Sequence, residues 1–126
     1  MSPLFHILSG GASLVALVLM ILQFVFPRGT KNHIRRACAA GLIVLGVIIG
    51  NTWYVSSVRG LRWDIPFFVH TGFGILFFVA YLLTLYFGHQ SLRNKASSVR
   101  HGSMGALATL ILVVSLIFGF LAPFFR

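Results

Sequence analysis

Acidic residues are almost absent from this chain: Asp64 is the only one among 126 residues, against ten lysines and arginines. Proton pumps and cation carriers usually place carboxylates inside the membrane, and catalysis by a carboxylate pair needs two such groups. Asp64 falls in a stretch that we expect to connect two apolar segments. The sequence therefore argues against both classes of protein.

Cysteine is nearly absent as well. Cys38 is the single one, which excludes an internal disulfide framework and a paired-cysteine metal site, and we expect it to be a small buried thiol. The chain also has no P-loop and no HExxH motif. Its basic residues lie in short segments that flank apolar runs, so they do not indicate binding to nucleic acid.

Long apolar runs dominate what is present. Hydrophobic residues make up 58% of the chain and charged residues 9%, a composition typical of an integral membrane protein. We expect four membrane-spanning helices, each close to the ~20 residues that cross a bilayer. The first should be retained, because it has no basic n-region and no small-x-small cleavage site. The fold prediction is an all-α, four-helix transmembrane bundle with up-down-up-down topology, formed by one domain over residues 1–126, with spans at about 4–26, 34–53, 66–88 and 101–122.

The lysines and arginines predict the orientation of these spans. Seven fall in the first and third connections and three in the second connection and the C-terminal tail. The positive-inside rule then places both termini outside, on the periplasmic side of a bacterial inner membrane. A net charge of +9 also favours contact with anionic membrane lipid. The seven are Arg28, Lys31, Arg35, Arg36, Arg93, Lys95 and Arg100, and the three are Arg59, Arg62 and Arg126.

Four of the five histidines share one pattern. Each lies at or near the start of an apolar segment and is followed four residues later by a small residue, which one helical turn places on the same face. The arrangement offers a nitrogen lone pair beside nearly bare backbone. A haem needs both, a ligand for its iron and room for its ring. The pairs are His6 with Gly10, His33 with Ala37, His70 with Gly74 and His101 with Gly105.

An internal two-helix repeat places these histidines at two depths. It aligns His6 with His70 and His33 with His101, at offsets of 64 and 68 residues. Spans one and three, like two and four, should be diagonal neighbours of the bundle. Each pair could therefore present two imidazoles to one central metal, with the sites ~20 Å apart.

Local charge supports the same interpretation. A helix N-terminus disfavours imidazolium, so histidines near helix starts should be neutral and able to ligate a metal. Arg35, Arg36 and Arg100 flank the inner pair and could neutralise haem propionates. Arg59 and Arg62 could do so at the outer face.

At these residues the chain resembles the cytochrome b561-like class of small membrane cytochromes. It also looks like bacterial four-helix proteins whose helices begin with a histidine followed by glycine. The resemblance implies two b-type haems, one held by His6 and His70 and the other by His33 and His101. It also implies electron transfer within or across the membrane, with a membrane redox partner or a quinone. The chain would act either alone or as a subunit of a redox complex.

Two other interpretations remain open. Small residues on helix faces also promote close helix packing without a cofactor, so the chain could be a scaffold or accessory subunit of a membrane complex. The same histidines could instead hold the magnesium of a pigment. His89 lacks the small residue of the pattern, and we expect it to be an interfacial histidine outside any site.

Overall fold

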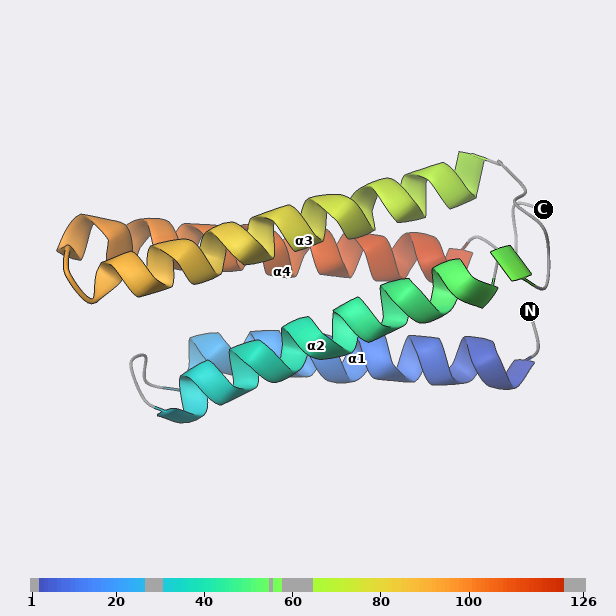
Figure 1. Ribbon diagram of the computed structural model, residues 1–126, viewed down its shortest axis with the longest axis horizontal. Helices are drawn as coiled ribbons and strands as arrows, with labels where there is room; N and C mark the ends of the chain where they lie inside the picture. Colours follow the sequence, from blue (N-terminus) through green and yellow to red (C-terminus); the bar gives the residue numbers. More distant parts are fainter. Residues whose placement is uncertain (1–2, 27–30, 55, 58–64, 122–126) are drawn as a thin grey trace.

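Four long helices make up the fold in the computed structural model, which describes residues 3–26, 31–54, 56–57 and 65–121 and, within them, not the side chains of 3, 6 and 65–68. The helices are α1 (Pro3–Val25), α2 (Lys31–Tyr54), α3 (Ile65–Ser91) and α4 (Lys95–Leu121) (Figure 1). No strand occurs in these ranges. The prediction of an all-α four-helix bundle is confirmed.

Each helix is long and apolar enough to cross a membrane. Large apolar side chains point outward on all four, among them Leu8, Leu42, Ile75 and Leu110, each 60% exposed or more. A surface of this kind is unfavourable in water and suits lipid acyl chains. The chain thus has the build of an integral membrane protein.

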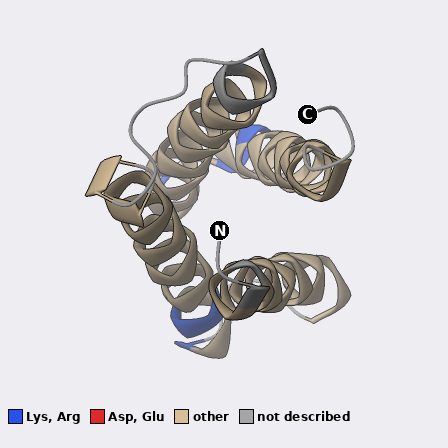
Figure 2. Cartoon of the chain, turned by 90° about the vertical axis from the view of Figure 1, so that its right-hand side faces the viewer, with Lys and Arg blue, Asp and Glu red and all other residues tan. Residues whose placement is uncertain are grey.

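The helices follow one another around the bundle. α1 packs on α2 and α3 packs on α4 as two antiparallel hairpins, which meet through α1 with α4 and α2 with α3. Figure 1 shows the α3–α4 hairpin lying over the α1–α2 hairpin, and Figure 2 shows the four helices end-on. Among the described residues α1 and α3 do not pack together, and neither do α2 and α4, so these are the diagonal pairs.

A small core at mid-length holds the bundle together. Each helix contributes one buried alanine, which lets the backbones approach closely. Phe77 is the largest fully buried side chain and fills the space between them. The alanines are Ala16, Ala40, Ala80 and Ala108.

Tyr81 links the two hairpins. Its hydroxyl group on α3 donates a hydrogen bond to the carbonyl oxygen of Ala37 on α2, at 2.7 Å. The ring lies against Gly41, where a Cβ atom would overlap it. Glycine at this position is what allows α2 and α3 to approach.

Lysines and arginines of the described residues gather at one end of the bundle, the end at which α1 joins α2 and α3 joins α4 (Figure 2). The sequence placed them in connecting loops, but five of the six lie on helices: Lys31, Arg35 and Arg36 on α2, and Lys95 and Arg100 on α4. Arg93 lies in the turn between α3 and α4, and Arg28 is outside the described residues. α2 begins three residues before the predicted start, and α4 begins six residues before it. Asn94 starts α4 by accepting a hydrogen bond from the backbone N–H of Ala96, which is an N-cap.

One further expectation from the sequence is wrong. Cys38 is exposed on the outer surface of α2 and is not a buried thiol. Alanines and glycines of this helix, Ala40 and Gly41 among them, take the inward positions instead. A thiol is apolar enough to face lipid at little cost.

The Tyr81 contact predicts a large difference between two glycines of α2. Gly41→Ala should lower the free energy of unfolding by ~1–3 kcal/mol, because the added methyl group must displace a buried aromatic ring. Gly46→Ala is the matched control, since nothing lies within 4 Å of a Cβ atom there. Thermal unfolding in detergent, followed by circular dichroism, measures both. Equal stability of the two variants would contradict the assigned contact.

Candidate functional site

The predicted site histidines lie at both ends of the bundle. His33, in the first turn of α2, and His101, in the second turn of α4, share the end that carries the basic residues. His70 lies in the second turn of α3, at the opposite end. His6 lies on α1, but its side chain is outside the described residues.

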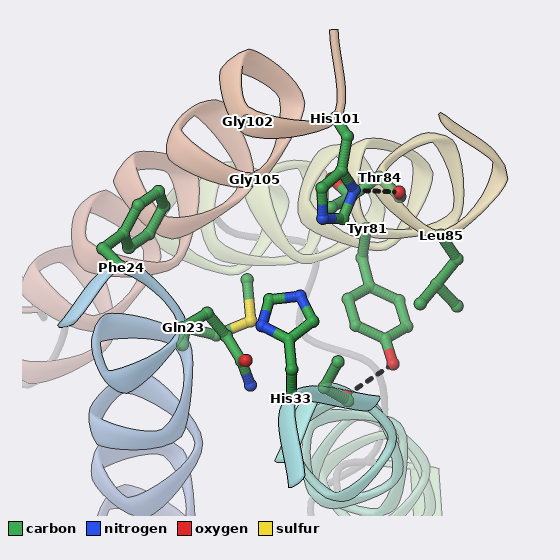
Figure 3. Close-up of a pocket in the computed structure, with 11 residues that line it drawn as sticks. Gln23, Phe24, His33, Tyr81, Thr84, Leu85, His101, Gly102 and Gly105 are labelled. Atoms are coloured by element: carbon green, nitrogen blue, oxygen red, sulfur yellow. Dashed lines mark hydrogen bonds between the residues drawn. The ribbon is translucent and has the colours of Figure 1, made fainter. Parts of the chain in front are cut away.

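His33 and His101 meet across the bundle, although α2 and α4 do not otherwise pack together. The centres of their rings are 5.9 Å apart and the ring planes are inclined by 66°. The rings face one another in a pocket of about 40 Å³ (Figure 3). Residues of all four helices line it: Met20, Gln23, Phe24, His33, Ala37, Tyr81, Thr84, Leu85, His101, Gly102 and Gly105.

The His101 ring is fixed by α3. Its Nδ1 lies 2.8 Å from the carbonyl oxygen of Thr84. Because a carbonyl oxygen can only accept, Nδ1 must carry the proton and Nε2 must hold the lone pair. Figure 3 shows that second nitrogen on the pocket side, toward His33. Metal-binding histidines are commonly held in this way, with the far nitrogen donating to a backbone carbonyl.

The His33 ring is held by α1. With its amide placed so that all its contacts are satisfied, Gln23 donates to His33 Nδ1 at 2.8 Å and accepts from the backbone N–H of Ala37 at 3.0 Å. A neutral His33 then carries its proton on Nε2. His33 and His101 therefore have complementary tautomers in this arrangement, a donor facing an acceptor.

The separation of the two rings suits a shared metal ion. Two imidazole nitrogens, each ~2 Å from one ion, place their ring centres roughly 6 Å apart, close to the 5.9 Å observed. The described residues contain no group of three or more metal-ligating side chains. A two-histidine site fits a metal whose other ligands come from a macrocycle, as in haem.

Space is the main obstacle to a macrocycle here. A pocket of about 40 Å³ holds a few water molecules, whereas clefts for drug-sized ligands measure ~300–1,000 Å³. A haem between His33 and His101 therefore requires the hairpins to open around the two rings, while the rings keep about their present separation. The donor atoms fit the group, and the present spacing of the hairpins does not.

The small residues of the sequence pattern differ in their surroundings. Gly74 is open, with nothing within 4 Å of an added Cβ atom. Gly105 lines the pocket, but a Cβ atom added there would contact Thr84 and Phe24. A Cβ atom added to Gly10 would contact Phe120. Room beside the helix is therefore present one turn from His70 and is filled one turn from His101.

The three predicted arginines lie at the same end as the pocket without lining it. Arg36 packs its guanidinium group over the ring of Phe26, at 5.0 Å. Its buried Nε and Nη2 atoms have no hydrogen-bond partner among the described residues, which is unfavourable unless an anion or water supplies one. Arg100 lies over Phe87, at 6.0 Å, and Arg35 is exposed.

The residues that orient the rings were not predicted from the sequence. Gln23 is the only amide within the first apolar segment, and a polar side chain there needs a partner; this signal could have identified it. Tyr81 and the carbonyl group of Thr84 gave no such signal, because their roles depend on which helices pack together.

The expected effect of the helix termini does not reach two of the histidines. The field of a helix terminus fades within the first turn, and His70 and His101 lie beyond it. Their hydrogen bonds to backbone carbonyls, and not the helix termini, determine that Nδ1 of the neutral ring carries the proton and that Nε2 is free.

Comparison with known proteins gives no match: no family model, no curated protein and no solved structure is similar to this chain.

Proposed function

We propose that this chain is a di-haem b-type membrane cytochrome in which His33 and His101 are the axial ligands of one haem. The observation that carries the proposal is the meeting of these two rings, 5.9 Å apart, from helices that are otherwise not in contact. His70 would serve the second haem together with His6.

Bound haem would supply one-electron redox chemistry, and with two histidines as ligands its iron has no open position for oxygen. The protein's part is to orient the ligands and exclude water. Thr84 sets the tautomer of His101, and Gln23 must rotate its amide or release His33 before His33 Nε2 can ligate. Arg36, with two unpartnered nitrogens, is suited to a propionate.

Electron transfer in this setting would use a membrane redox partner or a quinone. The gathering of basic residues at one end supports a cytoplasmic location for that end. Both termini would then be periplasmic in a bacterial inner membrane, and the haem of His33 and His101 would lie toward the cytoplasm.

A second candidate is a cofactor-free scaffold subunit. The small pocket favours it, and so do Gly46 and Gly50, which leave open space on α2 at the GxxxG spacing of helix-docking faces. Under this alternative the His33–His101 pair is a hydrogen bond that joins the hairpins. A pigment-binding role, with magnesium in place of iron, uses the same ligands and differs in its absorption spectrum.

Replacement of single histidines tests the haem assignment. His101→Ala should remove about half of the low-spin haem absorbance of the purified protein, because one of two sites loses a ligand. His89→Ala should leave it unchanged, since His89 is exposed at the end of α3. Absorption spectra of the oxidised and reduced proteins, scaled to protein concentration, give both values. Equal loss from the two variants would refute the assignment of ligands.

Tyr81→Phe tests whether the hairpins separate on haem binding. Loss of the hydrogen bond to Ala37 should lower the free energy of unfolding of the haem-free protein by about 1 kcal/mol. Haem uptake should be as fast as in the wild type or faster, because the link that holds the hairpins together is weaker. Slower uptake would show that Tyr81 belongs to the haem-bound arrangement. Stopped-flow absorbance and chemical unfolding measure the two effects.

A further inference from the structure

The α3–α4 hairpin contains a second repeat, distinct from the one that relates the two halves of the chain. With an offset of 31 residues, both helices carry a histidine, a glycine four residues later, a hydroxyl residue fourteen later and a glycine eighteen later. The segment Thr84–Gly88 reads TLYFG and Ser115–Gly119 reads SLIFG. The repeated residues are His70, Gly74, Thr84 and Gly88 in α3, and His101, Gly105, Ser115 and Gly119 in α4.

Contacts between the two helices follow the same repeat. His101 of α4 has its Nδ1 2.8 Å from the carbonyl oxygen of Thr84, and His70 of α3 has its Nδ1 3.2 Å from that of Ser115. Both bonds are made to the residue fourteen positions after the other histidine. Two antiparallel helices joined by equivalent contacts at both ends are related by an approximate two-fold axis between them.

Each ring also lies on a glycine of the opposite helix. A Cβ atom on Gly88 would approach Nδ1 and Cε1 of His101 to 2.9 Å, and one on Gly119 would approach the same two atoms of His70 to 3.4 and 3.2 Å. The glycine is one turn beyond the carbonyl that binds Nδ1. Backbone carbonyl and glycine together form a cradle, which holds the Nδ1 edge of the ring and leaves Nε2 outside it.

We infer that Gly88 with the Thr84 carbonyl, and Gly119 with the Ser115 carbonyl, are paired positioning cradles that hold His101 and His70 as Nδ1–H tautomers with Nε2 free to ligate. The hairpin is thus one inverted unit with a ligand at each end. Fourteen helical residues separate the two rings by about 21 Å. Only the identity of the ligand that meets Nε2 rests on the proposed function.

The surroundings of the two cradles differ, because Thr84 carries a methyl group that Ser115 lacks. Thr84 places its Cγ2 3.5 Å from a Cβ atom built on Gly105. Ser115 has no such methyl group, and at the equivalent Gly74 nothing lies within 4 Å. The end of the hairpin that carries His70 therefore has more room beside its ligand.

Nitrogen-15 NMR of the histidine rings in the haem-free protein tests the cradles. His70 and His101, identified by the signals lost in His70→Ala and His101→Ala, should both be Nδ1–H tautomers at neutral pH, with His33 the opposite. An Nε2–H form of either His70 or His101 in the wild type overturns the inference, whatever the variants do. If the wild type binds no haem while both tautomers are as expected, the proposed function fails and the cradles stand.

Glycine variants test the cradles one at a time. Gly88→Ala should convert His101 to mixed tautomers and leave His70 unchanged, and Gly119→Ala should do the reverse more weakly. Gly46→Ala is the control and should alter neither. In the haem-loaded protein Gly88→Ala should weaken retention of one haem roughly 10–100-fold, as loss of a group that orients a ligand does.

Side-chain variants separate the backbone contact from the hydroxyl groups. Thr84→Val and Ser115→Ala keep both carbonyls and should leave both tautomers as in the wild type, even though the Ser115 hydroxyl lies 3.4 Å from His70 Nδ1. A change of tautomer in Ser115→Ala would assign the role to that hydroxyl and overturn the backbone cradle at His70. A Gly88→Ala protein that folds with His101 still wholly Nδ1–H would overturn the role of the glycine.

Discussion

Polar groups inside this bundle depend on hydrogen bonds between helices, because no water reaches the hydrocarbon region to replace them. Few side chains carry such bonds here, and the main ones gather where helices meet. His101 binds the Thr84 carbonyl, His70 binds the Ser115 carbonyl and Tyr81 binds the Ala37 carbonyl. These contacts fix the register of α4 on α3 and of α3 on α2. They also decide which ring nitrogen each histidine presents.

The contacts within the α3–α4 hairpin hold its two helices more firmly than the contacts between the two hairpins hold the hairpins together. The α3–α4 hairpin is held at both ends by a histidine that lies on a glycine of the opposite helix, so sliding of one helix would break two bonds at once. The α1–α2 hairpin meets it through the small core and Tyr81. The pocket is lined by both hairpins, and packing between the hairpins is weaker than packing within them. Haem binding and the observed pocket are compatible if the rigid hairpin supplies His101 and the α1–α2 hairpin moves.

The fold could be predicted from the sequence, and so could part of the site. Four apolar runs of membrane length determine the helices, and short connections determine their order around the bundle. The helix ends could be predicted less well, because Asn94 caps α4 well before its apolar run begins. The convergence of His33 and His101 followed from the order of the helices and the shared depth of the two residues. The tautomers did not, because they depend on backbone carbonyls whose positions appear only when α3 and α4 are packed together. Gly88 and Gly119 were visible as a repeat in the sequence, but their meaning required the ring that lies on each of them.

The central claim, that paired histidines hold haem in this bundle, is tested most directly by titration of the haem-free protein in detergent or lipid with haem. Absorbance of the low-spin, six-coordinate form should rise in proportion to added haem and stop at two equivalents per chain. Saturation at one equivalent would restrict the claim to a single pair of histidines. A protein that folds with its helices intact but never develops the low-spin spectrum would contradict it.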